Sequence, residues 1–218
     1  MKVRFYSVII SLLIFFSETN ADSNLNVVVS IKPFHSLVAG VMLGVAHPEL
    51  LLKGNFSPHT YSLKPSDAKK LQYADLVFWG GAALEGFLSK PISSLSKNAE
   101  VVSILEINGL KLRSFRAKSH IGKSENIESY SHNLTKNQVT ELKAAVDPHI
   151  WLDPENAKVI TQETVKILSN FDPENALKFQ KNGEKIIVRL NELDQQISSE
   201  MNEISDSTYL VLVHAQLF

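Results

Sequence analysis

The stretch "LNVVVSIKPFHSLVAGVML", Leu25 to Leu43, decides the fold of this chain. Its first part, Leu25–Ile31, is a short apolar run rich in β-branched residues, which is typical of a strand buried on both faces of a parallel sheet. The residues that follow, Pro33–Leu43, change to the spacing of a helix. A buried strand that passes directly into a helix predicts the start of an α/β unit.

The same alternation continues along the first half of the chain. Three more apolar runs predict buried strands at Glu49–Lys53, Asp75–Gly80 and Val101–Leu105, and Pro65–Tyr73 has a helical pattern. Because strands alternate with helices, we expect an α/β fold, a lobe built on a parallel sheet with helices on both faces. Ligands of such lobes collect beyond the carboxyl ends of the strands, where loops converge.

The composition is that of an ordinary folded protein, and it limits the kinds of partner and ligand. The 218 residues are 44% hydrophobic with a formal net charge of -1, so neither nucleic acid nor an anionic membrane surface is suggested as a partner. The chain contains no cysteine. We therefore expect no disulfide, and any metal would be held by His, Asp, Glu or water.

The first 21 residues have the pattern of a secretory signal peptide. Lys2 and Arg4 precede the apolar run Phe5–Phe16, and Ala21 offers a small residue at the cleavage site. A run of about 12 residues is shorter than the ~20 that span a bilayer. We expect cleavage after Ala21 and, since no cysteine lies there, no lipid anchor. The mature chain, residues 22–218, is predicted to be soluble, without membrane insertion, and periplasmic.

The motif "DPEN" occurs twice, at Asp153–Asn156 and at Asp172–Asn175. Each copy places an Asp suited to capping a helix before a Pro and a Glu suited to its first turn. Two helices are therefore predicted to begin there. The second has apolar residues spaced by three or four from Pro173 to about Ser205, a length on the order of 50 Å. We expect residues 173–206 to form a linker helix that leads out of the lobe.

Residues 22–172 are expected to form the N-terminal α/β lobe. Within it, the polar segment at about 111–142 has no sustained strand or helix period and is predicted to be a mobile loop. His120 and His132 lie in this segment, where they could collect metal weakly or simply be solvated.

Residues 207–218 are interpreted as the start of a second lobe that is truncated. They contain the predicted strand Thr208–Val213, which has no later partner in the sequence. An unpaired strand is a template for another chain, and an uncovered apolar stripe on the linker helix is a site of association. Self-association through this end of the chain is therefore possible.

Three stretches of the chain carry a family resemblance: "VVVSIKPFHSLVAGVM", "SPHTYSLKPSDAKKLQYADLVFWGG" and "DPHIWLDPENAKVI". In this order, and followed by a long helical pattern and a strand ending in His214, they resemble the ZnuA-like zinc-binding receptors of ABC importers. The resemblance covers Asn26 to His214. It implies a bilobed periplasmic protein that is no enzyme, captures Zn²⁺ and delivers it to an ABC permease.

The resemblance also implies that the metal lies between the lobes and is held by His59, His149 and His214. Neutral imidazoles suit Zn²⁺, whereas the manganese-binding relatives have a carboxylate where His214 stands. Two positions depart from the family. Pro58 takes the place of a Glu that some zinc receptors carry, and "HAQLF" lacks the acidic residue that usually follows the third histidine.

Two of the candidate ligands also have a purely structural explanation. His59 can be an exposed loop residue, and His149 can be a partly buried ring beside Trp151 that a backbone carbonyl satisfies. For His35 we expect a hydrogen bond within the fold rather than a contact to a metal ligand, and His47 is predicted to lie on the surface.

Two other functions stay open. The first is a truncated or decaying remnant of such a receptor, with weakened or no transport. The second is a zinc hydrolase, because three histidines and a water also form the first shell of hydrolytic zinc sites. The sequence favours it less, since it contains no "HExxH" and no carboxylate that is evidently fixed beside the site.

Overall fold

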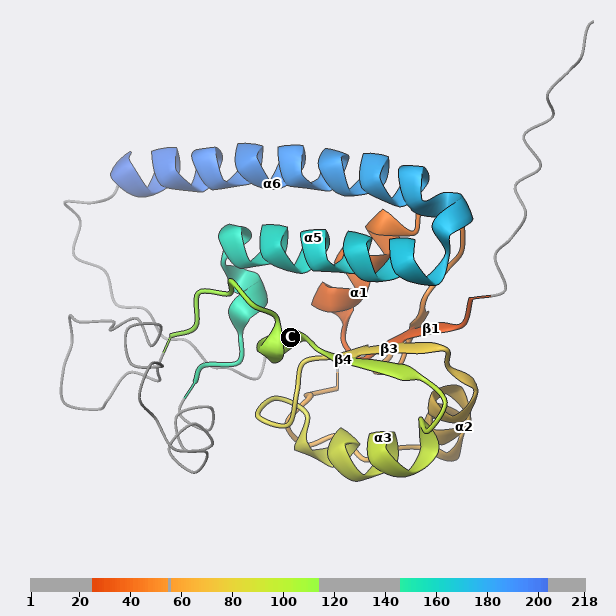
Figure 1. Ribbon diagram of the computed structural model, residues 1–218. Helices are drawn as coiled ribbons and strands as arrows, with labels where there is room; N and C mark the ends of the chain where they lie inside the picture. Colours follow the sequence, from red (N-terminus) through yellow and green to blue (C-terminus); the bar gives the residue numbers. More distant parts are fainter. Residues whose placement is uncertain (1–24, 55, 114–145, 204–218) are drawn as a thin grey trace, which may run out of the picture.

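The computed structural model describes residues 25–54, 56–113 and 146–203 (Figure 1). The expected signal peptide, His120, His132, His214 and the predicted strand Thr208–Val213 lie outside the described residues.

A parallel four-stranded sheet forms the centre of the described structure. Its strands are β1 (Val27–Val29), β2 (Glu49–Leu50), β3 (Leu76–Trp79) and β4 (Glu100–Ser103), in the order β2-β1-β3-β4. Val28 is paired with Glu49 on one side and with Val77 on the other. All three residues of β1 are 3% exposed or less, as expected of a strand covered on both faces.

Each strand overlaps its predicted apolar run and is shorter, but β2 and β4, at the two edges of the described sheet, are not buried as predicted. β2 keeps only the first two residues of its predicted run. The prediction for the fourth strand was wrong at its end, because β4 stops at Ser103 and a 3-10 turn, Ile104–Glu106, follows. Ile104 is fully buried there, so its apolar character reflects burial of the turn rather than strand structure.

Helices cover both faces of the sheet, as predicted. α1 (Lys32–Val41), α5 (Pro154–Phe171) and α6 (Ala176–Glu203) lie on one side, and α2 (Pro65–Tyr73) and α3 (Ser89–Leu95) on the other (Figure 1). α3 was not predicted, since only one of its seven residues, Ile92, is buried and its helical period is correspondingly weak. The α/β lobe is thus confirmed.

The connections place a topological switch point between β1 and β3. The chain passes from β1 to β2 through α1 on one face, and from β2 to β3 through α2 on the other face (Figure 1). In open α/β sheets, ligands bind beyond the carboxyl ends of the strands at such a point. The loop after β2, which carries His59, follows the carboxyl end of such a strand, and His149 lies in the segment before α5.

The two "DPEN" motifs begin helices in different ways. Asp153 caps α5 as predicted, with its Oδ1 accepting a hydrogen bond of 2.9 Å from the Glu155 N–H. Asp172 Oδ1 accepts from the Asn175 N–H at 3.3 Å, but Pro173–Asn175 form a 3-10 turn and the α-helix begins only at Ala176. The predicted start at Pro173 was therefore three residues early.

α6 is anchored to the lobe through its first half. The buried Asn182 donates through Nδ2 to the carbonyls of Val41 and Leu43, at 2.9 Å each, which ties α6 to the end of α1. Gly183 faces α5 so closely that an added Cβ would lie 2.4 Å from Val165 Cγ2. The absence of a side chain at Gly183 is what allows the two helices to approach.

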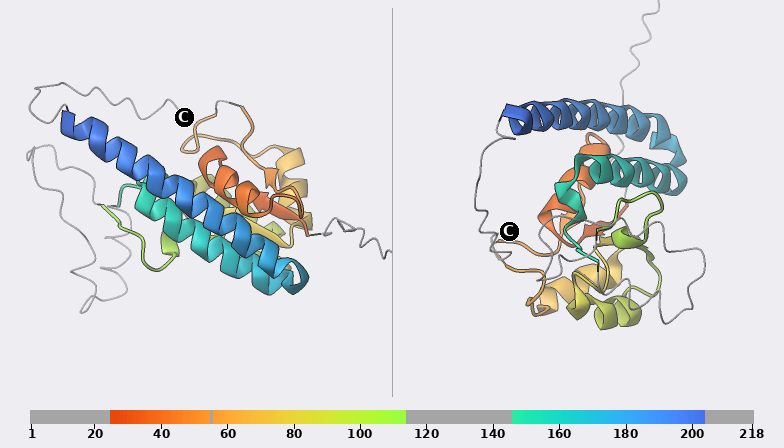
Figure 2. Two further views of the ribbon diagram at one scale, coloured as in Figure 1. Left: turned by 90° about the horizontal axis from the view of Figure 1, so that it is seen from above. Right: turned by 90° about the vertical axis from the view of Figure 1, so that its left-hand side faces the viewer.

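The second half of α6 extends past α5 (Figures 1 and 2). With 28 residues, α6 is about 42 Å long. It carries an exposed apolar stripe whose large members are 41 to 46% exposed: Leu193, Ile197 and Met201. No helix among the described residues combines the length and the hydropathy that a membrane crossing requires.

Candidate metal centre

His59 lies in the loop between β2 and α2, where its side chain is exposed. The loop is held in place by Tyr61, two residues further on. The Tyr61 ring is buried and packs edge-on against Phe87 at 5.4 Å, and its hydroxyl donates to Asp67 Oδ2 at 2.7 Å. Burial, followed by the hydrogen bond to Asp67, raises the pKa of Tyr61 to about 12, so the phenol stays neutral.

His149 lies in the turn that precedes α5 and is only partly accessible, with 21% of its side chain exposed. Its ring is flanked by Trp151 at a centroid distance of 5.2 Å. Trp151 in turn meets Phe34 of α1 edge-on at 5.4 Å. Since Phe34 is fully buried, the ring of His149 rests on the core of the lobe through Trp151.

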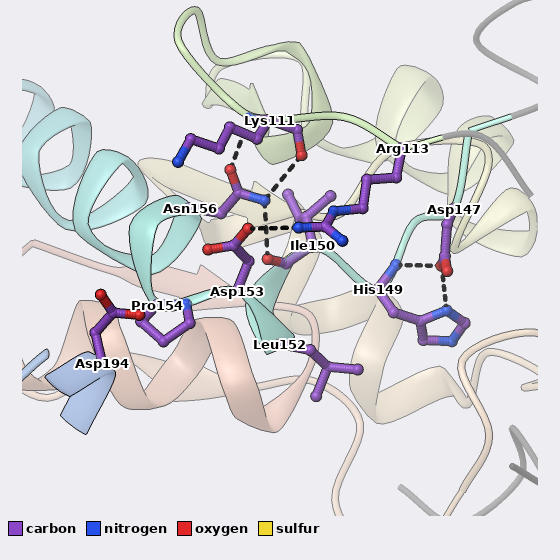
Figure 3. Close-up of a pocket in the computed structure, with 10 residues that line it drawn as sticks. All are labelled: Lys111, Arg113, Asp147, His149, Ile150, Leu152, Asp153, Pro154, Asn156 and Asp194. Atoms are coloured by element: carbon purple, nitrogen blue, oxygen red, sulfur yellow. Dashed lines mark hydrogen bonds and ion pairs between the residues drawn. The ribbon is translucent and has the colours of Figure 1, made fainter. Parts of the chain in front are cut away.

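Asp147 orients the ring of His149 (Figure 3). Its Oδ1 accepts from the His149 backbone N–H at 3.0 Å and lies 2.6 Å from Nδ1 of the imidazole. Because a carboxylate only accepts hydrogen bonds, Nδ1 carries the proton and Nε2 presents its lone pair. This is the tautomer that a metal ligand requires, with a carboxylate partner that increases its basicity. The hydrogen-bond partner of the His149 ring is therefore the Asp147 side chain, whereas the structural explanation had expected a backbone carbonyl.

The fold brings His59 and His149 together across 90 positions of the sequence. Their ring centroids lie 5.7 Å apart with an interplanar angle of 61°. Two imidazoles bound to one tetrahedral ion at ~2.1 Å would have centroids about 5 Å apart. The observed separation is close to that value, as binding of a single ion by both rings would require.

The other histidines are placed elsewhere or are not described. His35 Nε2 lies 3.0 Å from the carbonyl oxygen of Pro48, so His35 is satisfied within the fold, and His47 is exposed, both as predicted. Among the described residues no three His, Cys, Asp or Glu side chains form a metal-binding group. The third predicted ligand, His214, is outside the described part, so the three-histidine set stays a prediction.

A pocket of about 400 Å³ opens beside His149 (Figure 3). The segment after β4 supplies Lys111 and Arg113 to its wall, and α6 supplies Asp194. Arg113 pairs with Asp153 across 3.6 Å. The pocket therefore joins one of the candidate ligands to the start of α5 and to the middle of α6.

Asn156 holds this wall together, a role that sequence reasoning missed. Its Oδ1 accepts from the Lys111 N–H at 2.7 Å, and its Nδ2 donates to the carbonyls of Lys111 and Ile150, at 3.1 and 3.2 Å. Asn156 is 2% exposed, and its bond to Ile150 is fully buried. The role of Asp147 was missed as well, although an Asp two residues before a histidine is a recognisable local signal.

Curated relatives of the chain include the high-affinity zinc uptake system protein ZnuA of Brucella abortus (strain 2308). It is 34% identical over 220 residues, which cover 90% of this chain and 64% of the relative. The protein of the same name from Yersinia pestis is 28% identical over 187 residues, covering 85% of this chain and 58% of the relative. The chain thus spans less than two thirds of the length of these relatives.

Solved structures share the fold. One described as the crystal structure of ZnuA has a TM-score of 0.62 at 21% identity, covering 80% of this chain and 59% of its own. Zn(II)-bound AdcA from Streptococcus pneumoniae has a TM-score of 0.60 at 22% identity, covering 79% and 32%. The sequence pattern of the family described as "Zinc-uptake complex component A periplasmic" matches residues 27–217. Since that match runs through the sheet, both histidine loops and α6, the chain belongs to the ZnuA family of periplasmic zinc-uptake components.

Proposed function

We propose that this chain captures Zn²⁺ as the receptor of a zinc-uptake system, through His59, His149 and His214. The observation that carries the proposal is the approach of the His59 and His149 rings to 5.7 Å, with Asp147 leaving Nε2 of His149 free to bind. The relatives named as high-affinity zinc uptake proteins support the choice of metal.

The donor set suits zinc for a chemical reason. Imidazole nitrogens are borderline ligands that match Zn²⁺ at tetrahedral sites, whereas Mn²⁺ prefers carboxylate and water oxygens. The sequence contains no "HExxH" motif to supply a general base, and Asp147 Oδ1, the carboxylate oxygen beside the His149 ring, accepts from the backbone N–H and Nδ1 of that residue. The arrangement favours capture of an ion over hydrolysis, and the zinc is cargo rather than a resident cofactor.

The partner that follows from this function is the permease of an ABC importer, which takes up the zinc from the periplasm. The third ligand, His214, would come from the other part of the receptor that contacts the metal, and it lies outside the described residues. The alternative is a receptor remnant with weak binding and no transport, and a measured affinity separates the two.

The proposal is tested by calorimetric titration of the mature chain with Zn²⁺. We expect His59→Ala, His149→Ala and His214→Ala each to weaken binding by roughly tenfold or more, the effect of losing a direct ligand. The control is His47→Ala, which removes an exposed imidazole bordering a different pocket and should bind like the parent. Unchanged affinity in both His59→Ala and His149→Ala would show that the site has been misassigned.

A further inference from the structure

A buried carboxyl group lies near the ends of β1 and β3. Glu85 follows β3 and is fully buried. Its Oε2 accepts a hydrogen bond of 2.6 Å from the Gly80 N–H at the end of β3. Ser30, at the end of β1, faces the carboxyl and is 1% exposed. The group therefore lies between the ends of β1 and β3, at the switch point of the sheet.

Among the described residues, no cation acts on Glu85 to balance a negative charge. The polar groups that act on the carboxyl within the described chain are the Ser30 hydroxyl, from the β1 end, and the Gly80 N–H, from the β3 end. The other neighbours are apolar, since an added Cβ on Gly80 would meet Leu84 Cδ2, Glu85 Oε2 and Phe34 Cε2. An isolated carboxylate in such a place is strongly disfavoured relative to the neutral acid.

Two buried polar atoms also support a neutral Glu85. Among the described residues, neither Glu85 Oε1 nor the Ser30 hydroxyl has a hydrogen bond of ordinary geometry, although the hydroxyl is close enough to influence the carboxyl. A proton on Oε1 could be donated to Ser30 Oγ, which would satisfy both atoms and remove the charge. Burial raises the pKa of Glu85 to about 7, against smaller lowering effects of Ser30 and Gly80.

The turn that Glu85 anchors packs against the loop of His59. We call residues Gly80–Leu88 the anchor turn. The Glu85 N–H donates to the Gly81 carbonyl at 2.9 Å, and the Leu88 N–H donates to the Glu85 carbonyl at 2.8 Å. Phe87, next along the turn, packs against Tyr61, two residues from His59.

The route to His149 passes through Phe34. Phe34 and the Glu85 carboxyl line the same space above Gly80, each 3.2 Å from the position of an added Cβ. Phe34 also meets Trp151, whose ring flanks His149. One buried carboxyl thus adjoins the supports of both rings.

We propose that Glu85 is a positioning residue whose protonated, neutral form keeps the anchor turn packed beneath the His59 and His149 loops. Ionisation of Glu85 brings an unbalanced charge into the interior and loosens that packing. This inference extends the proposed function, because it concerns how the two rings are held, but its tests need no metal.

The first test is the pH dependence of folding of the metal-free mature chain against Glu85→Gln, which keeps the shape and stays neutral. With a pKa of about 7 when folded and about 4.5 when unfolded, the folded state holds a proton that the unfolded state has lost. Stability from this group is therefore present at low pH and lost as pH rises from about 4.5 to 7. The unfolding constant of the parent, divided by that of Glu85→Gln, should rise on the order of a hundredfold between about pH 5 and 8.5.

The second test measures position. Hydrogen exchange of residues 57–63 and 147–152 is compared between parent and Glu85→Gln at equal pH, so that intrinsic exchange rates cancel. We expect equal rates at about pH 5.5 and at least threefold faster exchange in the parent at about pH 8.5. The Gly80 amide proton signal of the parent provides a readout without any variant, and should titrate with a midpoint near 7 because it donates to Glu85.

The outcomes are distinct. A pH-independent ratio of unfolding constants, or a Gly80 signal that titrates near pH 4.5, would refute the protonation of Glu85 in the folded chain. A titrating carboxyl with equal exchange in both histidine loops would overturn its positioning role. Neither result depends on zinc binding, so a failure of the proposed function would show only in the calorimetric experiment.

Discussion

Replacing Asp147 tests how the protein prepares His149 for a metal. In Asp147→Ala the His149 ring loses the partner at 2.6 Å that holds the proton on Nδ1, and the His149 backbone N–H loses its acceptor at 3.0 Å. Asp147→Asn keeps an acceptor oxygen for both bonds but removes the negative charge. The two variants therefore separate the geometric contribution of Asp147 from the electrostatic one.

The expected loss of zinc affinity depends on how exposed the Asp147–His149 pair is to solvent. Loss of a carboxylate that orients a metal-binding histidine typically weakens binding by about 10- to 100-fold, or about 1.4 to 2.7 kcal/mol. The Asp147 side chain is 45% exposed, so solvent screens part of its charge. We expect the lower end of that range, about tenfold, for Asp147→Ala, and roughly threefold for Asp147→Asn.

The assay is a competition titration of the metal-free chain with a zinc chelator at constant pH and ionic strength. Asp194→Asn is the matched control, because it removes the same charge from the wall of the same pocket but lies on α6. We expect the control to bind zinc like the parent. If Asp147→Ala bound zinc as tightly as the parent, the orienting role of Asp147 would be refuted. If Asp194→Asn lost as much zinc affinity as Asp147→Ala, the effect would come from the change of charge and not from orientation of the ring.

Further consequences can be checked on the same chain. Zinc affinity should fall as pH is lowered from about 7 to 5, because imidazoles must be deprotonated to bind, and an affinity that stays flat in calorimetry would indicate carboxylate ligands. Gly183→Ala should destabilise the chain by about 1 kcal/mol in urea unfolding, since overpacking against Val165 outweighs the gain in helix propensity; Gly86→Ala, where a Cβ meets nothing within 4 Å, is the control. Asp153→Ala should cost about 1 kcal/mol through loss of the α5 cap, and unchanged stability would contradict that role. Light scattering after size-exclusion chromatography should show self-association of the mature chain, and a clean monomer would contradict the interpretation of residues 208–213.

The elements that could be predicted are those whose sequence pattern reports their own burial. β1 and β3 are apolar runs because both faces of each strand are covered, and α2 begins at Pro65 and ends at Tyr73 as its pattern indicates. α3 escaped prediction because a helix with one buried residue leaves almost no period. The end of β4 was misplaced because apolar residues suit both a strand and a buried turn. The start of α6 was misplaced because the "DPEN" motif suits both a 3-10 turn and an α-helix.

For the candidate site, the sequence by itself determined the family through its motifs, and with it the histidines to consider. Only the tertiary structure brought His59 to 5.7 Å from His149, packed Tyr61 against Phe87 of the anchor turn and placed Trp151 on Phe34. Local patterns are produced by neighbours along the chain, so they are legible in the sequence. The ionisation of a buried carboxyl and the approach of two distant loops depend on groups that only folding brings together, and the sequence contains no local trace of them.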